Sequence, residues 1–268
     1  MSRMLYGANV VANSVRLHYL RYGGKGSALV LIPGITSPAI TWGFVAEKLA
    51  EYFDVYVLDV RGRGLSSSGD HLEYDTEACA QDILAFVQQL DLQDYFLVGH
   101  SMGARFAIRC AAMKPQGLKK IVLIDPPVSG PNRRAYPSQL PWYVDSIQQS
   151  IVGMNAEEMK QYCPTWTLEQ RQLRAEWLHT CYLPAIVKAF NDFHEVDIHQ
   201  YIPEVSVPTL LMVAGKGGVI LEEDIQEIQS LNSQVLVSRV EQAGHMIPWD
   251  DEQGFYQGFG TFLGQQIV

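Results

Sequence analysis

The sequence predicts a doubly wound α/β fold, a mostly parallel sheet with helices on both faces and one inserted helical segment. Two observations predict this class. Short apolar, β-branched runs alternate with helical patterns along most of the chain, and such alternation is typical of parallel sheets. The alternation stops between about Pro126 and Pro203, where helical patterns follow one another without a convincing strand.

Strands are expected at the apolar runs, because parallel strands buried on both faces form nearly continuous apolar segments. These runs lie at residues 15–22, 28–33, 54–60, 95–100, 120–125, 209–215 and 234–240. Between the runs, apolar residues recur at helical spacing, which predicts helices at residues 76–90, 104–113 and 221–231. The core of the fold is therefore expected to comprise residues 1–125 and 204–268.

The interruption predicts a helical cap at residues 126–203, inserted after the sixth strand and covering the carboxyl edge of the sheet. Thr167 and Gln170 have the spacing of a capping box at a helix start. The alternative is a helical excursion that packs elsewhere, with its aromatic residues in the core. The helical patterns lie at residues 141–151, 155–163, 167–182 and 184–193.

The charge balance argues against a nucleic-acid partner. The 268 residues carry a net charge of −9, with no cluster of Lys and Arg, so the basic surface that neutralises phosphates is missing. A pocket can hold a local cation against this net charge, and a small anionic substrate is compatible with it. No apolar run reaches the roughly 18 residues that span a membrane, and the first residues lack the pattern of a signal peptide.

The four cysteines, Cys79, Cys110, Cys163 and Cys181, form no CxxC pair. They are expected to be free thiols in a reducing compartment, which predicts a cytoplasmic protein. The sequence has no HExxH motif, no zinc-type Cys/His spacing and no glycine-rich phosphate loop, so neither a metal nor a cofactor is expected. Nothing in the sequence indicates an oligomeric state.

The strongest chemical motif is Gly99-His100-Ser101-Met102-Gly103, a G-x-S-x-G sequence. It follows one apolar run and opens a helical pattern, which is the context of a nucleophile elbow. Such a turn leaves no room for side chains at its glycines. It presents the serine at a helix N-terminus, whose dipole favours developing negative charge. Ser101 is therefore the expected nucleophile.

A serine hydroxyl is a poor nucleophile unless a base takes its proton, and His245 is the expected base. It lies in a loop after the last predicted strand and before the final helix. The order serine, acid, histidine along the chain is typical of this chemistry. His100 adjoins Ser101, but the elbow turns its side chain away from that of the serine.

The acid that orients His245 is expected to be Asp125, at the end of the run at residues 120–125. The carboxyl ends of parallel strands form the edge where sites of this architecture lie. The more usual place for the acid, after the run at residues 209–215, reads Lys-Gly-Gly-Val-Ile, and the acids at residues 222–224 belong to a helix start. The alternative role for Asp125 is a turn-forming residue before proline.

The oxyanion of such a reaction needs two hydrogen-bond donors. The residue after the nucleophile, Met102, supplies one backbone amide, and the loop after the run at residues 28–33 supplies the other. In that loop Gly34 allows close approach of the backbone, which favours the amide of Ile35. Thr36 and Ser37 are candidates for hydroxyl contacts with the substrate. The alternative is an ordinary Pro-Gly turn.

The chain resembles the α/β-hydrolase superfamily over essentially its full length. The resemblance is carried by the Pro33-Gly34 loop, the Asp59–Ser66 turn, the Gly99–Gly103 elbow and the terminal Gly244-His245. The family more often has His-Gly at the first of these, and more often places its acid one strand later. Some haloalkane dehalogenases also place the acid after the sixth strand. Dehalogenases and epoxide hydrolases carry Asp at the nucleophile position, so Ser101 argues against both.

More narrowly, segments of the predicted cap and of the loops near it resemble the bacterial deformylases that act on N-formyl amides in nicotinate degradation. The resemblance implies hydrolysis of the formyl C–N bond of N-formylmaleamate to maleamate and formate, without a cofactor. The segments are PGITSPAITWGFVAE, DPPVSGPNRRAYP, LPWYVDSI, RAEWLHTCY and FHEVDIHQY.

A substrate of this kind carries a carboxylate, which needs either a cation or several neutral donors. For any one cation of the cap, a solvated surface position is the more common outcome. The candidate cations are Arg133 and Arg134 in the first cap loop, and Arg171, Arg174 and Lys188. The candidates for pocket wall and hydroxyl donors are Trp142, Tyr143 and Tyr182.

Two other functions stay open at the level of sequence. An esterase or carbon–carbon hydrolase of small acidic metabolites would use the same residues. A non-catalytic ligand receptor would share the scaffold, although the presence of Ser101, Asp125 and His245 together argues against it.

Overall fold

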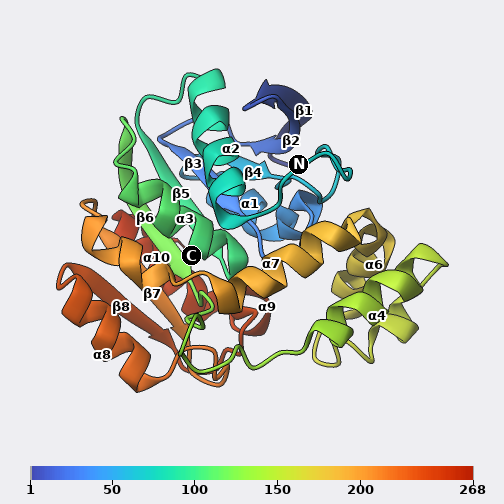
Figure 1. The fold of residues 1–268 in the computed structure, drawn as a ribbon. Coiled ribbons are helices and arrows are strands. Elements are labelled where there is room, and N and C mark those ends of the chain that lie inside the picture. The colour runs from blue at the N-terminus through green and yellow to red at the C-terminus, as the bar shows by residue number, and fades with distance from the viewer. Residues whose placement is uncertain (1, 268) are drawn as a thin grey trace.

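The computed structural model describes residues 2–267 and contains one eight-stranded sheet with helices on both faces (Figure 1). The strand order is β1-β2-β4-β3-β5-β6-β7-β8. The first two pairings, β1 with β2 and β2 with β4, are antiparallel. All the others are parallel, which confirms the predicted fold class.

All seven expected strands are present, with small differences at their ends. The central strands are buried along almost their whole length, as expected for a sheet covered on both faces. Their bounds are Val15–Tyr22 for β2, Ala28–Ile32 for β3, Asp54–Leu58 for β4, Tyr95–His100 for β5, Leu118–Ile124 for β6, Thr209–Ala214 for β7 and Val235–Val240 for β8.

The eighth strand, β1 (Met4–Ala12), was not expected from the sequence. It forms an edge hairpin with β2 through Asn13 and Ser14, both of which have positive φ, 50° and 61°. Two consecutive left-handed residues are the signature of a tight hairpin turn. The strand is largely exposed, so it lacks the continuous apolar pattern that marked the others.

The two faces of the sheet are covered by different helices. One face packs against α2 (Thr76–Gln89), α3 (Met102–Ala112) and α8 (Glu222–Leu231). The other packs against α1 (Gly43–Leu49) and α10 (Glu252–Leu263). Successive strand residues alternate between the two, with Val30 on the first face and Leu31 on the second.

Between β6 and β7 the described chain forms helices and connecting loops but no strand. In Figure 1, α4 and α6 stand at one side of the sheet and α7 runs from them back toward it. We call residues 126–203 the cap. Its helices are α4 (Leu140–Ile151), α5 (Ala156–Met159), α6 (Leu168–Trp177) and α7 (Leu183–Glu195), with the 3₁₀ turn η2 (Leu178–Thr180). A second 3₁₀ turn, η3 (Ile198–Glu204), leads from the cap into the core.

Two cap helices are shorter than expected. The helix expected at residues 155–163 ends at Met159 of α5, and the helix expected at residues 167–182 ends at Trp177 of α6, followed by a 3₁₀ turn. Pro164 follows Cys163, and the residue before a proline is disfavoured in helical conformation. The capping box at Thr167 is confirmed: its hydroxyl accepts from the Gln170 amide at 3.2 Å, and the Gln170 side chain accepts from the Thr167 amide at 2.9 Å. Within residues 2–267, no helix combines the length and apolarity needed to cross a bilayer.

A buried ion pair ties the loop after β4 to α2. The Arg61 side chain is 5% exposed and that of Asp82 2%. The Arg61 Nε donates to Asp82 Oδ2 at 2.6 Å, and its Nη1 donates to the Glu73 carbonyl at 2.7 Å. Breaking one partner of such a pair leaves an uncompensated buried charge.

We expect Asp82→Ala to lower the free energy of unfolding by about 3–5 kcal/mol. The double variant Arg61→Met/Asp82→Leu should lose markedly less, because no unpaired charge stays buried. Urea unfolding of the two variants and the wild type measures both values. A double variant at least as unstable as Asp82→Ala would contradict the argument.

Candidate active site

Ser101 lies at the turn between β5 and α3 in a backbone conformation that few residues adopt. Its φ is 52° and its ψ −117°, and the residue is buried. A Cβ added at Gly99 would lie 2.3 Å from the Gly103 carbonyl oxygen, and one added at Gly103 would lie 2.0 Å from the Ile32 carbonyl oxygen. The close packing of β3, β5 and α3 therefore requires both glycines of the motif.

The structure brings Ser101, His245 and Asp125 together in hydrogen-bonding contact. His245 Nε2 lies 3.0 Å from Ser101 Oγ, and its Nδ1 lies 2.7 Å from Asp125 Oδ2. Since a carboxylate only accepts, Nδ1 carries the hydrogen and Nε2 is free to accept the serine proton. This is the geometry of a serine nucleophile with its base and an orienting acid.

Asp125 has no exposed surface and is held on both sides of its carboxylate. Its Oδ1 accepts from the Ala214 amide at 3.2 Å, while Oδ2 faces His245. Its φ of 46° turns the chain just beyond the end of β6. One strand later, a Cβ at Gly217 would lie 2.7 Å from the Ala214 Cβ and 3.1 Å from the His245 amide nitrogen. A side chain at position 217 would therefore require its neighbours to shift.

The two expected oxyanion donors have free amides. Neither the Ile35 nor the Met102 N–H donates to another group within residues 2–267. Met102 is the first residue of α3, where an amide has no intrahelical acceptor. Gly34 permits the approach, since a Cβ there would lie 2.9 Å from His100 Nδ1 and 3.5 Å from the Ser101 Cβ. Both amides are therefore available to a developing oxyanion.

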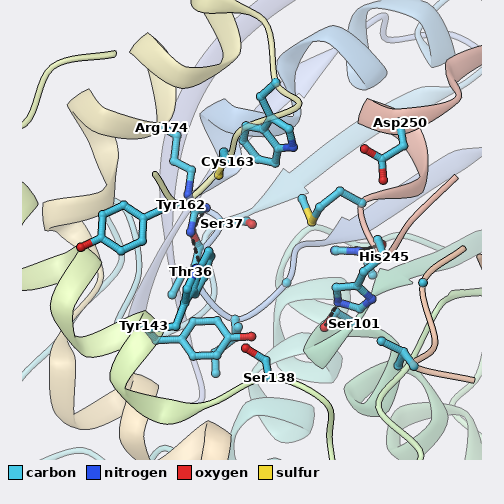
Figure 2. Close-up of a pocket in the computed structure, with 18 of the residues that line it drawn as sticks. Thr36, Ser37, Ser101, Ser138, Tyr143, Tyr162, Cys163, Arg174, His245 and Asp250 are labelled. Atoms are coloured by element: carbon cyan, nitrogen blue, oxygen red, sulfur yellow. Dashed lines mark hydrogen bonds between the residues drawn. The ribbon is translucent and has the colours of Figure 1, made fainter. Parts of the chain in front are cut away.

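Ser101 and His245 open into a cavity of about 380 Å³ between the sheet edge and the cap. Of the residues expected at the site, Ile35, Thr36, Ser37, Trp142 and Tyr143 line it. Figure 2 shows Arg174 and Tyr162 on one side of this pocket, with Ser101 and His245 on the other. The cap thus covers the carboxyl edge of the sheet, and the alternative of a helical excursion that packs elsewhere is excluded.

Arg174 of α6 is the arginine that lines the pocket. It is 4% exposed, and its two terminal nitrogens donate to the Thr36 carbonyl at 3.1 Å and to Thr36 Oγ1 at 3.0 Å. Its guanidinium lies 5.7 Å from the ring centres of both Trp142 and Trp166. Its Nε is buried without a partner, and Arg174 forms no salt bridge within residues 2–267. A guanidinium has five N–H donors, so several remain for an anion.

The expectation that Arg133 and Arg134 contact a substrate is not supported. Arg133 forms a bidentate pair with Glu227 of α8 at 2.7 and 2.8 Å. Arg134 donates to Asp224 at 2.6 Å and to the Val219 carbonyl at 3.0 Å. Both side chains tie the first cap loop to α8 instead of lining the cavity, because carboxylates there offer charged acceptors.

Three other cap residues also lie outside the pocket. The Tyr182 hydroxyl donates to Asp70, so this tyrosine does not supply the pocket wall expected of it. Arg171 pairs with Glu157 at 3.3 Å. Lys188 pairs with Asp192 one turn further along α7.

Tyr136 of the first cap loop was missed by sequence reasoning. Its hydroxyl lies 3.3 Å from His245 Nε2, and the residue lines the pocket. Burial raises the pKa of Tyr136 well above its usual range, and the neighbouring Tyr143 raises it further. The hydroxyl therefore stays protonated and can donate. No spacing rule marks this residue, since its place depends on how the loop folds over the sheet edge.

His100 holds the loop that carries the base. Its Nε2 lies 3.0 Å from the His245 carbonyl oxygen, which only accepts, so Nε2 carries the hydrogen and donates. Its Nδ1 is buried without a partner. Burial, together with the nearby His245, lowers the pKa of His100 from 6.5 to about 3. His100 is therefore neutral beside the base and adds no second positive charge.

The thiols of the described chain are all free and buried: Cys79, Cys110, Cys163 and Cys181. Burial raises the pKa of Cys79 and of Cys181 to about 12, so both are neutral. Within residues 2–267, no group of three or more His, Cys, Asp or Glu side chains is arranged to hold a metal ion.

We expect acid destabilisation that depends on His100. The unfolded chain binds a proton at this residue below about pH 6.5, whereas the folded protein does so only near the shifted pKa of about 3. Stability should therefore fall as the pH drops through this window, by at most about 1.4 kcal/mol per pH unit from this residue. His100→Gln keeps an N–H donor for the His245 carbonyl but does not titrate, and should flatten the decline.

Urea unfolding across the same pH window measures the slope. His179→Gln is the control, because His179 is exposed and its removal should leave the slope unchanged. Parallel curves for the wild type and His100→Gln would refute the assignment.

Comparisons with known proteins agree with this geometry. The family model described as alpha/beta hydrolase fold matches residues 27–252. The chain is 66% identical over 268 residues to an N-formylmaleamate deformylase of Pseudomonas putida, covering 100% of both chains. The crystal structure of an N-formylmaleamic acid deformylase variant from a second strain of Pseudomonas putida matches with a TM-score of 0.92 and 53% identity, covering 95% of this chain and 100% of that chain.

A more distant structure, that of E-2-(acetamidomethylene)succinate hydrolase, matches with a TM-score of 0.79, covering 97% of this chain and 99% of that chain. At 19% identity this likeness shows the fold alone. Both the family model and the full-length match to a deformylase include the nucleophile elbow at residues 99–103. The chain belongs to the α/β-hydrolase family.

Proposed function

We propose that the protein is a serine hydrolase that cleaves the formyl C–N bond of N-formylmaleamate and releases maleamate and formate. One observation carries the proposal. One pocket has Ser101 and His245, with Asp125 behind His245, on one side, and on the other a buried arginine that has no carboxylate partner in the part of the chain that the structure describes. The full-length identity of 66% to a named deformylase supports the same substrate. The reaction then belongs to nicotinate degradation, as the sequence resemblance implies.

In the first half-reaction, Ser101 Oγ attacks the formyl carbon while its proton passes to His245 Nε2. The carbonyl electron pair moves to oxygen, and the amides of Ile35 and Met102 bind the resulting oxyanion. The tetrahedral intermediate then collapses. The C–N bond breaks, its electron pair stays on nitrogen, and His245 returns the proton to that nitrogen. Maleamate leaves, and the formyl group remains on Ser101 as an ester.

In the second half-reaction, His245 takes a proton from a water molecule that attacks the formyl ester. The oxyanion forms again in the same place and collapses with loss of Ser101 Oγ, which recovers its proton from His245. Formate leaves. Throughout, Asp125 keeps Nδ1 protonated and stabilises the imidazolium, and the Tyr136 hydroxyl beside Nε2 is available to hydrogen-bond the reacting amide.

The substrate carboxylate is assigned to Arg174. The formyl carbon must reach Ser101, and the carboxylate lies at the other end of this short, planar substrate. Arg174 stands across the pocket from Ser101 with its Nε unpaired. Asp250, at the rim beside His245, would repel a carboxylate bound in the reverse direction. These two charges favour one orientation of the substrate.

We divide the chain into a hydrolase core of residues 1–125 and 204–268 and the cap of residues 126–203, because the pocket lies between them. The partner is a small molecule, and the net charge of −9 disfavours nucleic acid. The four free cysteines favour the cytoplasm.

We expect the protein to release formate from N-formylmaleamate, and we expect this activity to depend on Ser101, His245 and Asp125. Ser101→Ala should lower turnover by about 10⁴–10⁶-fold and Asp125→Asn by about 10⁴-fold, because the first removes the nucleophile and the second the orientation of the base. Formate quantified over time, with correctly folded variants confirmed by circular dichroism, measures this.

A p-nitrophenyl ester assayed beside N-formylmaleamate separates the proposed activity from an esterase. Ester turnover far above formate release would overturn the substrate, and near-normal turnover by Asp125→Asn would overturn the acid. A non-catalytic receptor predicts no turnover of either compound.

Arg174→Gln should reduce kcat/KM for N-formylmaleamate by about 10- to 100-fold, mainly through KM, because a charged hydrogen bond is lost. It should leave kcat/KM for N-formylcrotonamide, which lacks the carboxylate, nearly unchanged. Arg171→Gln is the matched control: it lies on the same helix but pairs with Glu157 outside the pocket. Equal losses with both substrates would show that Arg174 does not bind the carboxylate.

A further inference from the structure

Arg63, in the loop after β4, joins the two residues assigned to the oxyanion hole. Its side chain is buried, with 1% of the residue exposed. Its Nε donates to the Ile35 carbonyl at 3.1 Å, and its Nη2 lies 3.3 Å from the Met102 sulfur. The remaining contacts are to the Arg61 carbonyl at 2.9 Å and to the Ala185 carbonyl of α7 at 3.4 Å. One rigid guanidinium therefore fixes the β3 loop, the start of α3 and the cap relative to one another.

All of these acceptors are neutral, so the charge of Arg63 is not compensated. Within residues 2–267 it takes part in no salt bridge. The titratable groups around it are Cys79, Cys181 and Tyr74, and burial raises the pKa of each. All three are uncharged at neutral pH. Burial lowers the pKa of Arg63 below its usual value, but a guanidinium keeps its proton in proteins. An unpaired buried charge is unfavourable for folding.

A second buried arginine, Arg105, provides a comparison, because its contacts are with the cap and not with the oxyanion-hole residues. Arg105 of α3 is also 1% exposed and also bonds to carbonyls. Its acceptors all lie at the two ends of the cap: the carbonyls of Pro127, Ser129, Asp192 and Val196. It ties the beginning and end of the cap to α3. Arg63 differs because its acceptors include both oxyanion-hole residues.

We propose that Arg63 is a positioning residue of the oxyanion hole. Its guanidinium holds Ile35 and Met102 in register, and its uncompensated positive charge lies behind the point where the tetrahedral oxyanion forms. The inference rests on the proposed function for the assignment of the two amides. Arg63 does not touch the substrate, and it acts through the residues that do.

Such a charge acts on the transition state more than on the bound substrate. The reacting carbonyl is neutral in the ground state and carries a full negative charge in the tetrahedral intermediate. Inside a buried site a fixed charge interacts more strongly than in water, and it needs no reorganisation when the oxyanion forms. Removing it should therefore lower kcat and the affinity for a tetrahedral anion, while the affinity for product changes little.

The test compares Arg63→Met, which removes the charge, and Arg63→Lys, which keeps the charge without the planar fork. Arg105→Met is the matched control. For each variant, kcat and KM are measured with N-formylmaleamate. Inhibition constants are measured for methylboronic acid, which forms a tetrahedral anion on a nucleophilic serine, and for maleamate, which reports on ground-state binding.

We expect Arg63→Met to lower kcat and the boronate affinity by about 100-fold each, and to change the maleamate affinity by less than about threefold. Arg63→Lys should lower kcat and the boronate affinity by a smaller factor. Arg105→Met should lower the thermal stability without changing the ratio of the two inhibition constants. If that ratio is unchanged in Arg63→Met, the proposal is wrong. If Arg63→Met does not fold, the same ratio in Arg63→Gln decides, because this variant also removes the charge but keeps an N–H donor; an unchanged ratio there contradicts the proposal.

If N-formylmaleamate is not the substrate, the measurements give a different result from a failure of the Arg63 proposal. The wild type would then release no formate from N-formylmaleamate. Turnover of p-nitrophenyl acetate and the boronate affinity would still report on Arg63, because neither depends on the amide substrate.

Discussion

The close approach of three backbone segments at the elbow is the constraint on which the site depends. Strand β5 turns into α3 with the carbonyl of Ile32, at the end of β3, against Gly103. This contact fixes Ser101 in its strained conformation at the N-terminus of α3, and beside it the amides of Ile35 and Met102 have no acceptor within residues 2–267. The cost of this backbone strain is met by the buried strands on either side. The nucleophile and both proposed oxyanion donors are consequences of one packing arrangement.

The ionisable groups around this elbow differ in charge and in the group that each one faces. Asp125, without exposed surface, faces His245 from one side. His100, kept neutral by burial, holds the same loop without adding charge. Arg63 and Arg174 are buried cations without carboxylate partners in the described chain, one behind the oxyanion donors and one across the pocket. Because neither has a carboxylate partner within residues 2–267, both fit the roles proposed for them, Arg63 behind the oxyanion and Arg174 at the substrate carboxylate.

Three arginines hold the cap on the core through contacts between the two parts. Arg133 and Arg134 bind carboxylates of α8, and Arg105 binds carbonyls at both ends of the cap. Together these contacts hold the first cap loop over the sheet edge. That placement brings the Tyr136 hydroxyl to His245 and closes the pocket with Trp142 and Tyr143.

The sequence by itself determined the parts of this protein that are encoded locally. Buried parallel strands read as continuous apolar runs, and the G-x-S-x-G turn excludes side chains at its glycines, so the sheet and Ser101 were predictable. Asp125 was predictable because it ends a strand at the edge where His245 returns. Only the tertiary structure decided which of several cap arginines faces the pocket, that Tyr136 meets the base, and that β1 forms an edge hairpin. These features depend on contacts between segments far apart in the chain, and an arginine carries the same local signal whether it meets a carboxylate of α8 or an open pocket.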